Sequence, residues 1–196
     1  MKEKVYLSID IDYWSKHSQS RKEAIEYIDE VIKLCPQNIK CVIYHHRLLP
    51  HINKSKSDTV YNIDFHSDLS DRVPNYCMNE GTWANFVKFK STGKFIWFYP
   101  FKECYDFLGR CDSEENPFDS PTDVAGWRHA EHKLYKPSLD WLKTKDITGI
   151  GFCISPDYID KDLAMPIVNF LHEKGCITKG KVSKIKGTYT RIGMVQ

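Results

Sequence analysis

The sequence lacks the cysteine spacing of a disulfide-rich or zinc-thiolate protein. Its seven cysteines are odd in number and scattered, and no two of them form a Cys-x-x-Cys pair. This pattern argues against a disulfide framework and against a zinc-thiolate site. Reduced thiols in a reducing compartment are therefore expected.

Long apolar runs and a strong net charge are also missing. No apolar run approaches the roughly 20 residues that a membrane-spanning helix needs. Residues 1–4 lead directly into a predicted strand instead of into the apolar segment of a signal peptide. A formal net charge of +2 gives no electrostatic case for a nucleic acid or a membrane as a partner. We therefore expect a cytoplasmic protein that binds neither.

The remaining composition suits one globular domain. The chain has 196 residues, of which 41% are hydrophobic and 13% aromatic, enough to bury a core without disulfide bonds. Strands are predicted in segments 5–14, 40–44, 60–69, 94–99 and 147–154, and helices in segments 21–34, 84–90, 138–144 and 163–174. This alternation predicts an α/β fold over residues 1–196, with three α/β/α layers and a mostly parallel sheet.

Two segments depart from this alternation. Residues 182–194 alternate like a final hairpin or edge strand, and the basic residues near them would mark a charged edge. Residues 101–136 are irregular, and a long segment of this kind in a domain is typical of a functional loop. The basic residues are Lys179, Lys181, Lys184, Lys186 and Arg191.

Potential metal ligands stand at alternate positions near the ends of two predicted strands. Asp64, His66 and Asp68 follow one apolar run, and Asp10 and Asp12 follow another. Because side chains alternate between the faces of a strand, each set would leave one face. A solvated strand face is the structural alternative for the first set. Neighbouring carboxylates are costly to bury without a cation, so the two sets together predict a metal site.

A histidine from a third strand is expected to join them. The predicted strand 40–44 delivers His45 and His46, and strand alternation leaves open which of the two is a ligand. In parallel sheets, ligands gather at the carboxyl ends of the strands. We therefore expect three separate strand ends to point at one place.

These motifs resemble the arginase/ureohydrolase family, in which a strand-end Asp-x-His-x-Asp, a second Asp-x-Asp and one more histidine hold two manganese ions. The local sequence is most similar to a divergent branch that includes the peptide arginases. Segment 45–50 resembles that branch's His-x-x-x-Leu-Pro element and thereby favours His45 over His46. Segment 62–69 resembles its Asp-x-His-x-Asp-Leu strand, and segment 8–14 resembles its Asp-x-Asp strand with two aromatic residues.

The resemblance implies Mn²⁺-dependent hydrolysis of arginine side chains in a ribosomal peptide, which gives ornithine and urea through a metal-bridging hydroxide. Asp64 and Asp10 would bridge two Mn²⁺ ions, because hard carboxylates with one imidazole per ion suit this metal. The remaining ligands would be His45 with Asp68 at one position, and His66 with Asp12 at the other.

The same chemistry needs a proton donor for the leaving amine and partners for the substrate. His129, His132 and Glu80 are candidates for the proton donor. Asp157, Glu80 and Trp127 are candidates for binding an arginine-containing peptide.

Two features depart from the family. In most arginases the Asp-x-Asp motif comes last, whereas here Asp10 and Asp12 come first, so an arginase-like sheet would be circularly permuted. Cys153 stands where a guanidinium-binding glutamate is usual. Another acidic residue would have to form the ion pair with the guanidinium, and Asp157 and Glu80 are the first candidates.

Three other functions fit part of the sequence. Asp10 and Asp12 could serve a phosphohydrolase of the haloacid-dehalogenase type with one Mg²⁺ ion, which leaves the motif at Asp64 unexplained. A Zn²⁺ deacetylase on the same scaffold would use fewer ligands than the sequence offers. A metal-binding or peptide-binding protein that has lost catalysis is supported by the missing glutamate. Metal content and a ligand-to-alanine comparison would separate such a protein from an enzyme.

Overall fold

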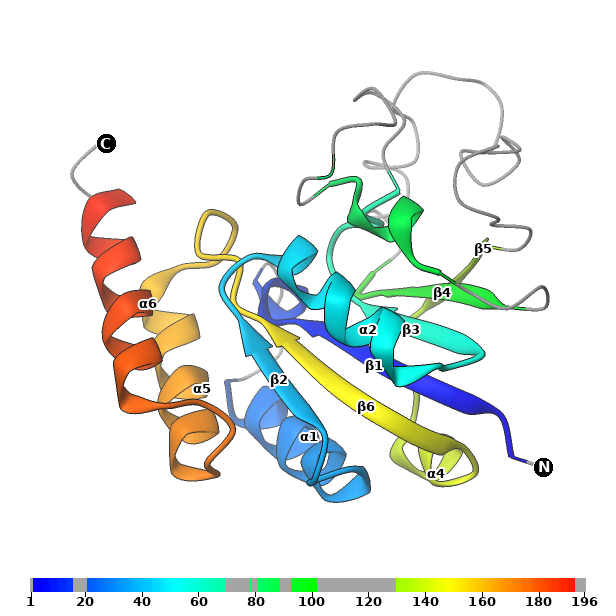
Figure 1. The fold of residues 1–196 in the computed structure, drawn as a ribbon. Coiled ribbons are helices and arrows are strands. Elements are labelled where there is room, and N and C mark those ends of the chain that lie inside the picture. The colour runs from blue at the N-terminus through cyan, green and yellow to red at the C-terminus, as the bar shows by residue number, and fades with distance from the viewer. Residues whose placement is uncertain are drawn as a thin grey trace.

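A computed structural model describes residues 2–15, 21–69, 78, 81–88, 93–101 and 130–192 of the chain. The strands are β1 (Lys4–Asp10), β2 (Ile39–Val42), β3 (Thr59–Ile63), β4 (Lys94–Tyr99), β5 (Ala130–Leu134) and β6 (Asp146–Cys153). The α-helices are α1 (Arg21–Leu34), α2 (Leu49–Ser55), α4 (Leu139–Lys143), α5 (Lys161–Glu173) and α6 (Lys179–Ile192). Short 3₁₀ helices are η1 (Ile11–Trp14), η2 (His45–Leu48) and η3 (Trp83–Phe86). Figure 1 shows how these elements are arranged.

The six strands form one sheet in the order β2-β6-β1-β3-β4-β5, and every neighbouring pair is parallel. This confirms the predicted α/β class and parallel sheet. The chain passes from β1 to β2 on one side of β1 and then returns to β3 on its other side. In open α/β sheets, the carboxyl ends of the strands at such a change of direction form the usual ligand-binding crevice.

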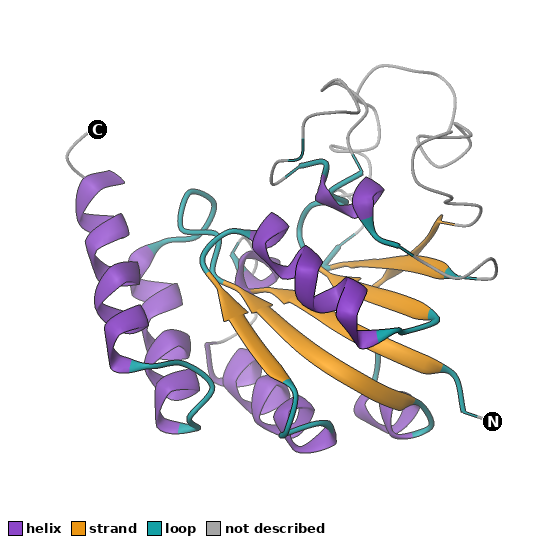
Figure 2. Ribbon diagram, viewed as in Figure 1, coloured by secondary structure: helices purple, strands orange, loops and turns teal. Residues whose placement is uncertain are grey.

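Helices cover both faces of the sheet, which confirms the predicted three layers (Figures 1 and 2). Successive side chains of β1 enter different buried clusters because they alternate between the two faces. Val5 and Leu7 pack with apolar residues of α1, α5 and α6. Tyr6 packs on the opposite face with Leu49 and Ile52 of α2. In the described ranges, no helix is both long enough and apolar enough to cross a membrane.

Local sequence signals account for several element boundaries. Helix α1 and strand β4 begin and end where the sequence predicts. The Ser138 hydroxyl caps α4 by accepting a hydrogen bond from the amide of Trp141. Helix α5 is followed by Gly175 with a φ of 74°, a left-handed conformation that glycine adopts without strain.

Several predictions of secondary structure are wrong. The predicted strands 5–14 and 60–69 are too long, because β1 ends at Asp10 and β3 ends at Ile63. The segment expected as a final hairpin or edge strand is helix α6, so its basic side chains do not lie on a sheet edge. Its buried residues Val182, Ile185 and Tyr189 recur at helical spacing, which the apparent alternation concealed. The irregular segment 101–136 contains strand β5. Residues 102–129 lie outside the described residues.

Replacing Gly187 by alanine is expected to raise the free energy of unfolding by about 0.5–1 kcal/mol, because alanine is the better helix former. Gly187 lies inside α6, and an added Cβ atom meets nothing within 4 Å. Gly151→Ala is the opposite case, because its Cβ would lie 2.6 Å from Tyr6 Oη and 2.6 Å from Leu48 Cδ1. We expect this variant to lose about 1–3 kcal/mol. Urea unfolding that finds Gly187→Ala the less stable of the two would contradict this packing.

Candidate metal centre

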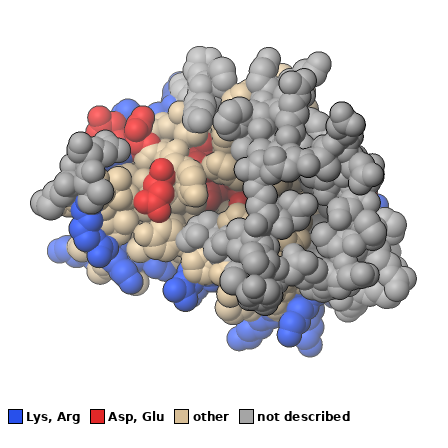
Figure 3. Space-filling view, turned by 90° about the horizontal axis from the view of Figure 1, so that it is seen from above, with Lys and Arg blue, Asp and Glu red and all other residues tan. Residues whose placement is uncertain are grey.

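The six predicted metal ligands lie together at the carboxyl edge of the sheet. They come from the end of β1 and η1 (Asp10, Asp12), from the start of η2 (His45), and from the segment after β3 (Asp64, His66, Asp68). All of these side chains except that of His66 are buried. Figure 3 views the molecule from above: visible lysine and arginine side chains lie along the outer rim, and acidic side chains also appear nearer the middle.

Local turns, and not strand alternation, place these ligands. Strand β3 ends before Asp64, so the prediction that Asp64, His66 and Asp68 share one strand face is wrong. Asp64 Oδ1 accepts a hydrogen bond from the amide of His66 at 2.8 Å. Asp10 Oδ1 accepts one from the amide of Asp12 at 3.1 Å. An aspartate that bonds the backbone two residues further on closes a turn, so both motifs turn the chain where their strands end.

Asp68 is positioned by its backbone and by η3. It has a φ of 58°, a left-handed conformation in which aspartate is found more often than most residues. Its carbonyl accepts a hydrogen bond from the amide of Ala84 at 3.3 Å, and Nε1 of Trp83 donates to its carboxylate. The Trp83 ring also lies 4.5 Å from the ring of His45. Helix η3 thus holds Asp68 and His45 together.

His45 is the centre of the first ligand group. Its Nδ1 atom lies 2.9 Å from an oxygen of Asp64, 2.9 Å from an oxygen of Asp68 and 3.3 Å from an oxygen of Asp10. The nitrogen is buried, and none of the three contacts has hydrogen-bond geometry. Its other ring nitrogen, Nε2, lies 2.6 Å from Ser8 Oγ. One imidazole nitrogen and three carboxylate oxygens that converge in this way are arranged like the ligands of a cation.

Asp64 also belongs to a second ligand group, formed with Asp12 and His66. His66 Nδ1 lies 2.9 Å from Asp12 Oδ2 and 3.9 Å from Asp64 Oδ1. Asp12 Oδ1 accepts a hydrogen bond from the amide of Phe65. Asp64 therefore offers one oxygen to each group. Asp10, which was expected as a second bridge, joins the first group only through His45, with which it and Cys153 form a further potential ligand group.

Burial and mutual repulsion oppose ionisation of the carboxyl groups. Burial, followed by the charges of Asp10 and Asp64, raises the pKa of Asp12 well above its usual value. Burial and the charge of Asp68 raise the pKa of Asp64 to about 7. Burial acts in the same direction on Asp10, but the close contact with His45 and the charge of its imidazole outweigh burial and lower the pKa of Asp10. Four ionised carboxylates at this place need positive charge nearby.

The histidines supply part of that charge. Burial lowers the pKa of His45, but Asp68 and the other carboxylates outweigh it and raise the pKa well above the usual value. Burial also lowers the pKa of His66, but the hydrogen bond and charge of Asp12 outweigh burial and raise this pKa to about 9. Two divalent cations would balance four carboxylate charges and leave both imidazoles neutral, as metal ligands must be. The donor set therefore fits a pair of cations in number and in charge.

Three further side chains contact the ligands, and no sequence motif marks them. Ser8, Trp83 and Ser155 bond to His45, Asp68 and Asp10, respectively. Ser8 could have been found, because it stands two residues before Asp10 on the same face of β1. Trp83 and Ser155 are 15 and 145 residues away from their partners in sequence, and no local pattern connects them.

Two other histidines lie apart from the ligand groups. His46 stacks on Tyr44 with ring centroids 6.3 Å apart, so His45 is the histidine that faces the carboxylates. His132, a candidate proton donor, lies in β5, two strands away from β3 in the sheet. Its ring lies beside that of Tyr99. The structure therefore does not bring His132 to the predicted ligands.

Asp157, a candidate for substrate binding, is exposed in the segment after β6. Its neighbour Tyr158 has its ring 4.8 Å from the ring of His66. Asp157 therefore lies near the more open side of the second ligand group. The other predicted residues, Glu80, Trp127 and His129, lie outside the described residues.

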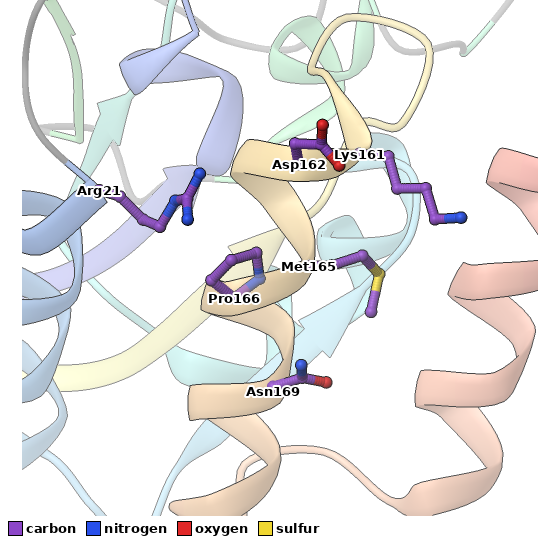
Figure 4. A pocket seen from close by; sticks show the side chains of 6 residues that line it. All are labelled: Arg21, Lys161, Asp162, Met165, Pro166 and Asn169. Carbon is purple, nitrogen blue, oxygen red and sulfur yellow. The ribbon is translucent and has the colours of Figure 1, made fainter.

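A surface pocket of about 400 Å³ lies between α1 and α5 (Figure 4). It is lined by Arg21, Lys161, Asp162, Met165, Pro166 and Asn169. None of the six predicted ligands lines it. The pocket is therefore distinct from the candidate metal centre.

Comparison of the chain with protein-family models, with curated proteins and with solved structures finds no match. A fold class alone does not define a function. The function must therefore be argued from the side chains at the carboxyl edge of the sheet.

Without metal, the protein is expected to lose stability as the pH rises from 6.5 to about 9. The pKa of His66 is raised from 6.5 to about 9, so its proton stabilises the fold fully below pH 6.5, and this contribution is lost as the pH passes 9. The pKa of Asp64, raised from 3.8 to about 7, acts with the same sign at lower pH. Denaturant unfolding with a chelator present measures the effect, which His66→Gln should reduce. A gain in stability over this range would contradict the electrostatic account.

Ser8→Ala is expected to weaken Mn²⁺ binding by about 10–100-fold, the usual effect of removing a group that orients a histidine ligand. Ser8 Oγ lies 2.6 Å from Nε2 of His45, so a hydrogen bond between them orients the ring. Ser57→Ala is the matched control, because Ser57 is also buried but its hydroxyl lies 2.6 Å from that of Thr148. Titration calorimetry compares the two variants. Unchanged affinity in Ser8→Ala would show that Ser8 does not orient a ligand.

Proposed function

We propose that this protein is a dinuclear metal hydrolase that acts on the arginine side chains of a peptide. The observation that carries the proposal is the position of Asp64 between two ligand groups. One of its oxygens faces His45 and the other faces His66. A shared carboxylate of this kind holds two cations about 3.5–4 Å apart, as in two-metal hydrolytic sites.

Residues of the chain would prepare this pair of positions. Ser8 Oγ is placed to accept the Nε2 proton of His45, which leaves the Nδ1 lone pair directed at Asp64 and Asp68. Trp83 donates to Asp68 and keeps its carboxylate beside His45. Partners that fix the tautomer and orientation of a ligand also raise its affinity for metal.

The carboxylate-rich donor set favours Mn²⁺. When bound, a pair of such ions would lower the pKa of a water molecule and supply a nucleophile at neutral pH. A substrate would approach from the side of His66, whose side chain is 30% exposed, whereas that of His45 is 2% exposed. Tyr158 packs against His66 and is itself exposed, so it would form the rim on this side.

The choice of peptide arginine as the substrate rests on three short segments that resemble the peptide arginases. It is supported by the fact that each segment, 8–14, 45–50 and 62–69, contributes residues to the ligand groups. The cation of arginine needs an acidic partner. Among the described residues, Asp157 is our candidate for that partner, next to the exposed ring of Tyr158.

A phosphohydrolase of the haloacid-dehalogenase type is supported less well. That chemistry needs a nucleophilic aspartate that can attack phosphorus. The carboxylate of Asp10 is buried, accepts hydrogen bonds from the Asp12 amide and from Ser155, and lies 3.3 Å from His45. Such surroundings suit a metal ligand better than a nucleophile. This function would also leave the pairing of Asp12 with His66 without a role.

Asp64→Asn is expected to abolish both Mn²⁺ binding and the conversion of arginine, because it removes the shared carboxylate and keeps the shape of the side chain. Activity is measured by mass spectrometry of arginine-containing peptides, free arginine and agmatine after incubation with Mn²⁺-loaded protein. Loss of CH₂N₂ from peptide arginine is the expected product signature. Asp140→Asn is the matched control, because its side chain is 94% exposed on α4.

The outcomes separate the metal centre from the substrate. Conversion of peptide arginine by the wild type and by Asp140→Asn, but not by Asp64→Asn, supports the whole proposal. An active, metal-free Asp64→Asn variant would overturn the metal mechanism. Bound Mn²⁺ with no change in any guanidino compound would overturn the arginine substrate and retain the metal centre.

A further inference from the structure

Strand β6 ends in the middle of the candidate metal centre. Its last residue, Cys153, pairs in register with Asp10 of β1 on one side and with Val42 of β2 on the other. His45 follows β2 by three residues. Cys153 therefore lies between the two strands that deliver Asp10 and His45. Its side chain is completely buried.

The thiol lies within reach of the first ligand group. The Sγ atom of Cys153, a carboxylate oxygen of Asp10 and a ring nitrogen of His45 all lie within 4.8 Å of one another. Three ligand atoms spread around one ion at about 2.0–2.3 Å lie about 3.7 Å apart on average. Because the three atoms here lie within 4.8 Å of one another, shifts of up to about 1 Å would bring them onto one ion. Nδ1 of His45 is buried and has no partner with hydrogen-bond geometry.

The fold itself gives Cys153 only weak partners. Its thiol donates to the carbonyl of Ile43 at 3.4 Å and lies 3.1 Å from Ser155 Oγ. Thiols are weak hydrogen-bond donors. A neutral thiol also cannot pair a guanidinium as a carboxylate does. Pairing with a substrate therefore does not account for sulfur at this position, where the side chain also packs in the apolar cluster on the α2 face.

We propose that Cys153 is a ligand of the first metal position and that this position takes a softer cation than the second. When the cation binds, the S–H bond breaks, a sulfur–metal bond forms, and the proton leaves to solvent. This inference rests on the dinuclear centre proposed above and adds a chemical difference between its two positions.

The two donor sets differ in the way that metal selectivity requires. The group that contains Cys153 combines its thiolate with the imidazole of His45 and the carboxylate of Asp10, a set that suits Zn²⁺, Fe²⁺ or Co²⁺. The second position offers carboxylates and the imidazole of His66, a set that suits Mn²⁺. When several metals compete, the first position is therefore expected to prefer the softer cation, whereas Mn²⁺ supplied alone fills both positions.

Cobalt(II) is the probe for the sulfur ligand, because a thiolate on Co²⁺ gives a near-ultraviolet charge-transfer band that oxygen and nitrogen ligands do not give. The metal-free full chain is titrated with Co²⁺, and the visible bands of the ion report binding independently. Cys153→Ser removes the sulfur and keeps the size, and Cys153→Ala is the second variant where serine is not tolerated. Cys41→Ser is the matched control, because Cys41 is also buried but packs in the helix-covered core.

Wild type and Cys41→Ser are expected to show the charge-transfer band with the first equivalent of Co²⁺. The Cys153 variants should bind Co²⁺ without this band and release fewer protons on binding. A Co²⁺-bound wild type without the band, or a band that persists in the Cys153 variants, would overturn the assignment of Cys153 and leave the dinuclear centre standing. A wild type that binds no Co²⁺ would overturn both.

Discussion

Repulsion among four buried carboxyl groups is the constraint on which the rest of this site depends. Asp10, Asp12, Asp64 and Asp68 are all buried at the carboxyl edge of one sheet. Leaving such a charge unpaired costs several kcal/mol each. Burial and this repulsion raise the pKa values of Asp64 and Asp12, and the imidazole of His45 relieves part of the repulsion. Divalent cations would relieve it completely, and the ligand geometry follows from that requirement.

The sheet makes such a concentration of charge tolerable because it fixes the groups before any cation arrives. Four neighbouring strands, β2, β6, β1 and β3, end side by side at the site. β1, in their middle, is covered on both faces by apolar side chains. Sites built on the ends of rigid elements hold their ligands in place better than sites built on free loops. The side chains of Ser8 and Trp83 then position the ring of His45 and the carboxylate of Asp68, so a cation would bind there with little reorganisation.

Much of the fold could be predicted from the sequence, because its signals are local. The period of α1, the apolar run of β4 and the serine cap of α4 each lie within one short segment. The sequence predicts an edge strand where the structure has helix α6. The apolar residues Val182, Ile185 and Tyr189 fit more than one spacing when their packing partners are not known. Contacts between elements decide such cases, and one sequence does not contain them.

The candidate site also combines residues that a local sequence signal identifies with residues that only the tertiary fold brings together. Chemistry marks Asp10, Asp12 and Asp64 as a set, since carboxylates two residues apart after an apolar run are conspicuous. Strand alternation predicts their placement, whereas in the structure Asp10 and Asp64 each accept a hydrogen bond from the amide two residues further on and so close a turn. The partners Trp83 and Ser155 could not be predicted, because they meet their ligands only through the tertiary fold.

The most direct test of the central claim is the number of Mn²⁺ ions that one chain binds, together with their magnetic coupling. Electron paramagnetic resonance during a Mn²⁺ titration counts the bound ions and detects exchange between neighbouring ones. A centre in which Asp64 bridges two positions predicts two bound ions per chain with a spin-coupled spectrum. Saturation at one ion, or two ions without coupling, would contradict the account.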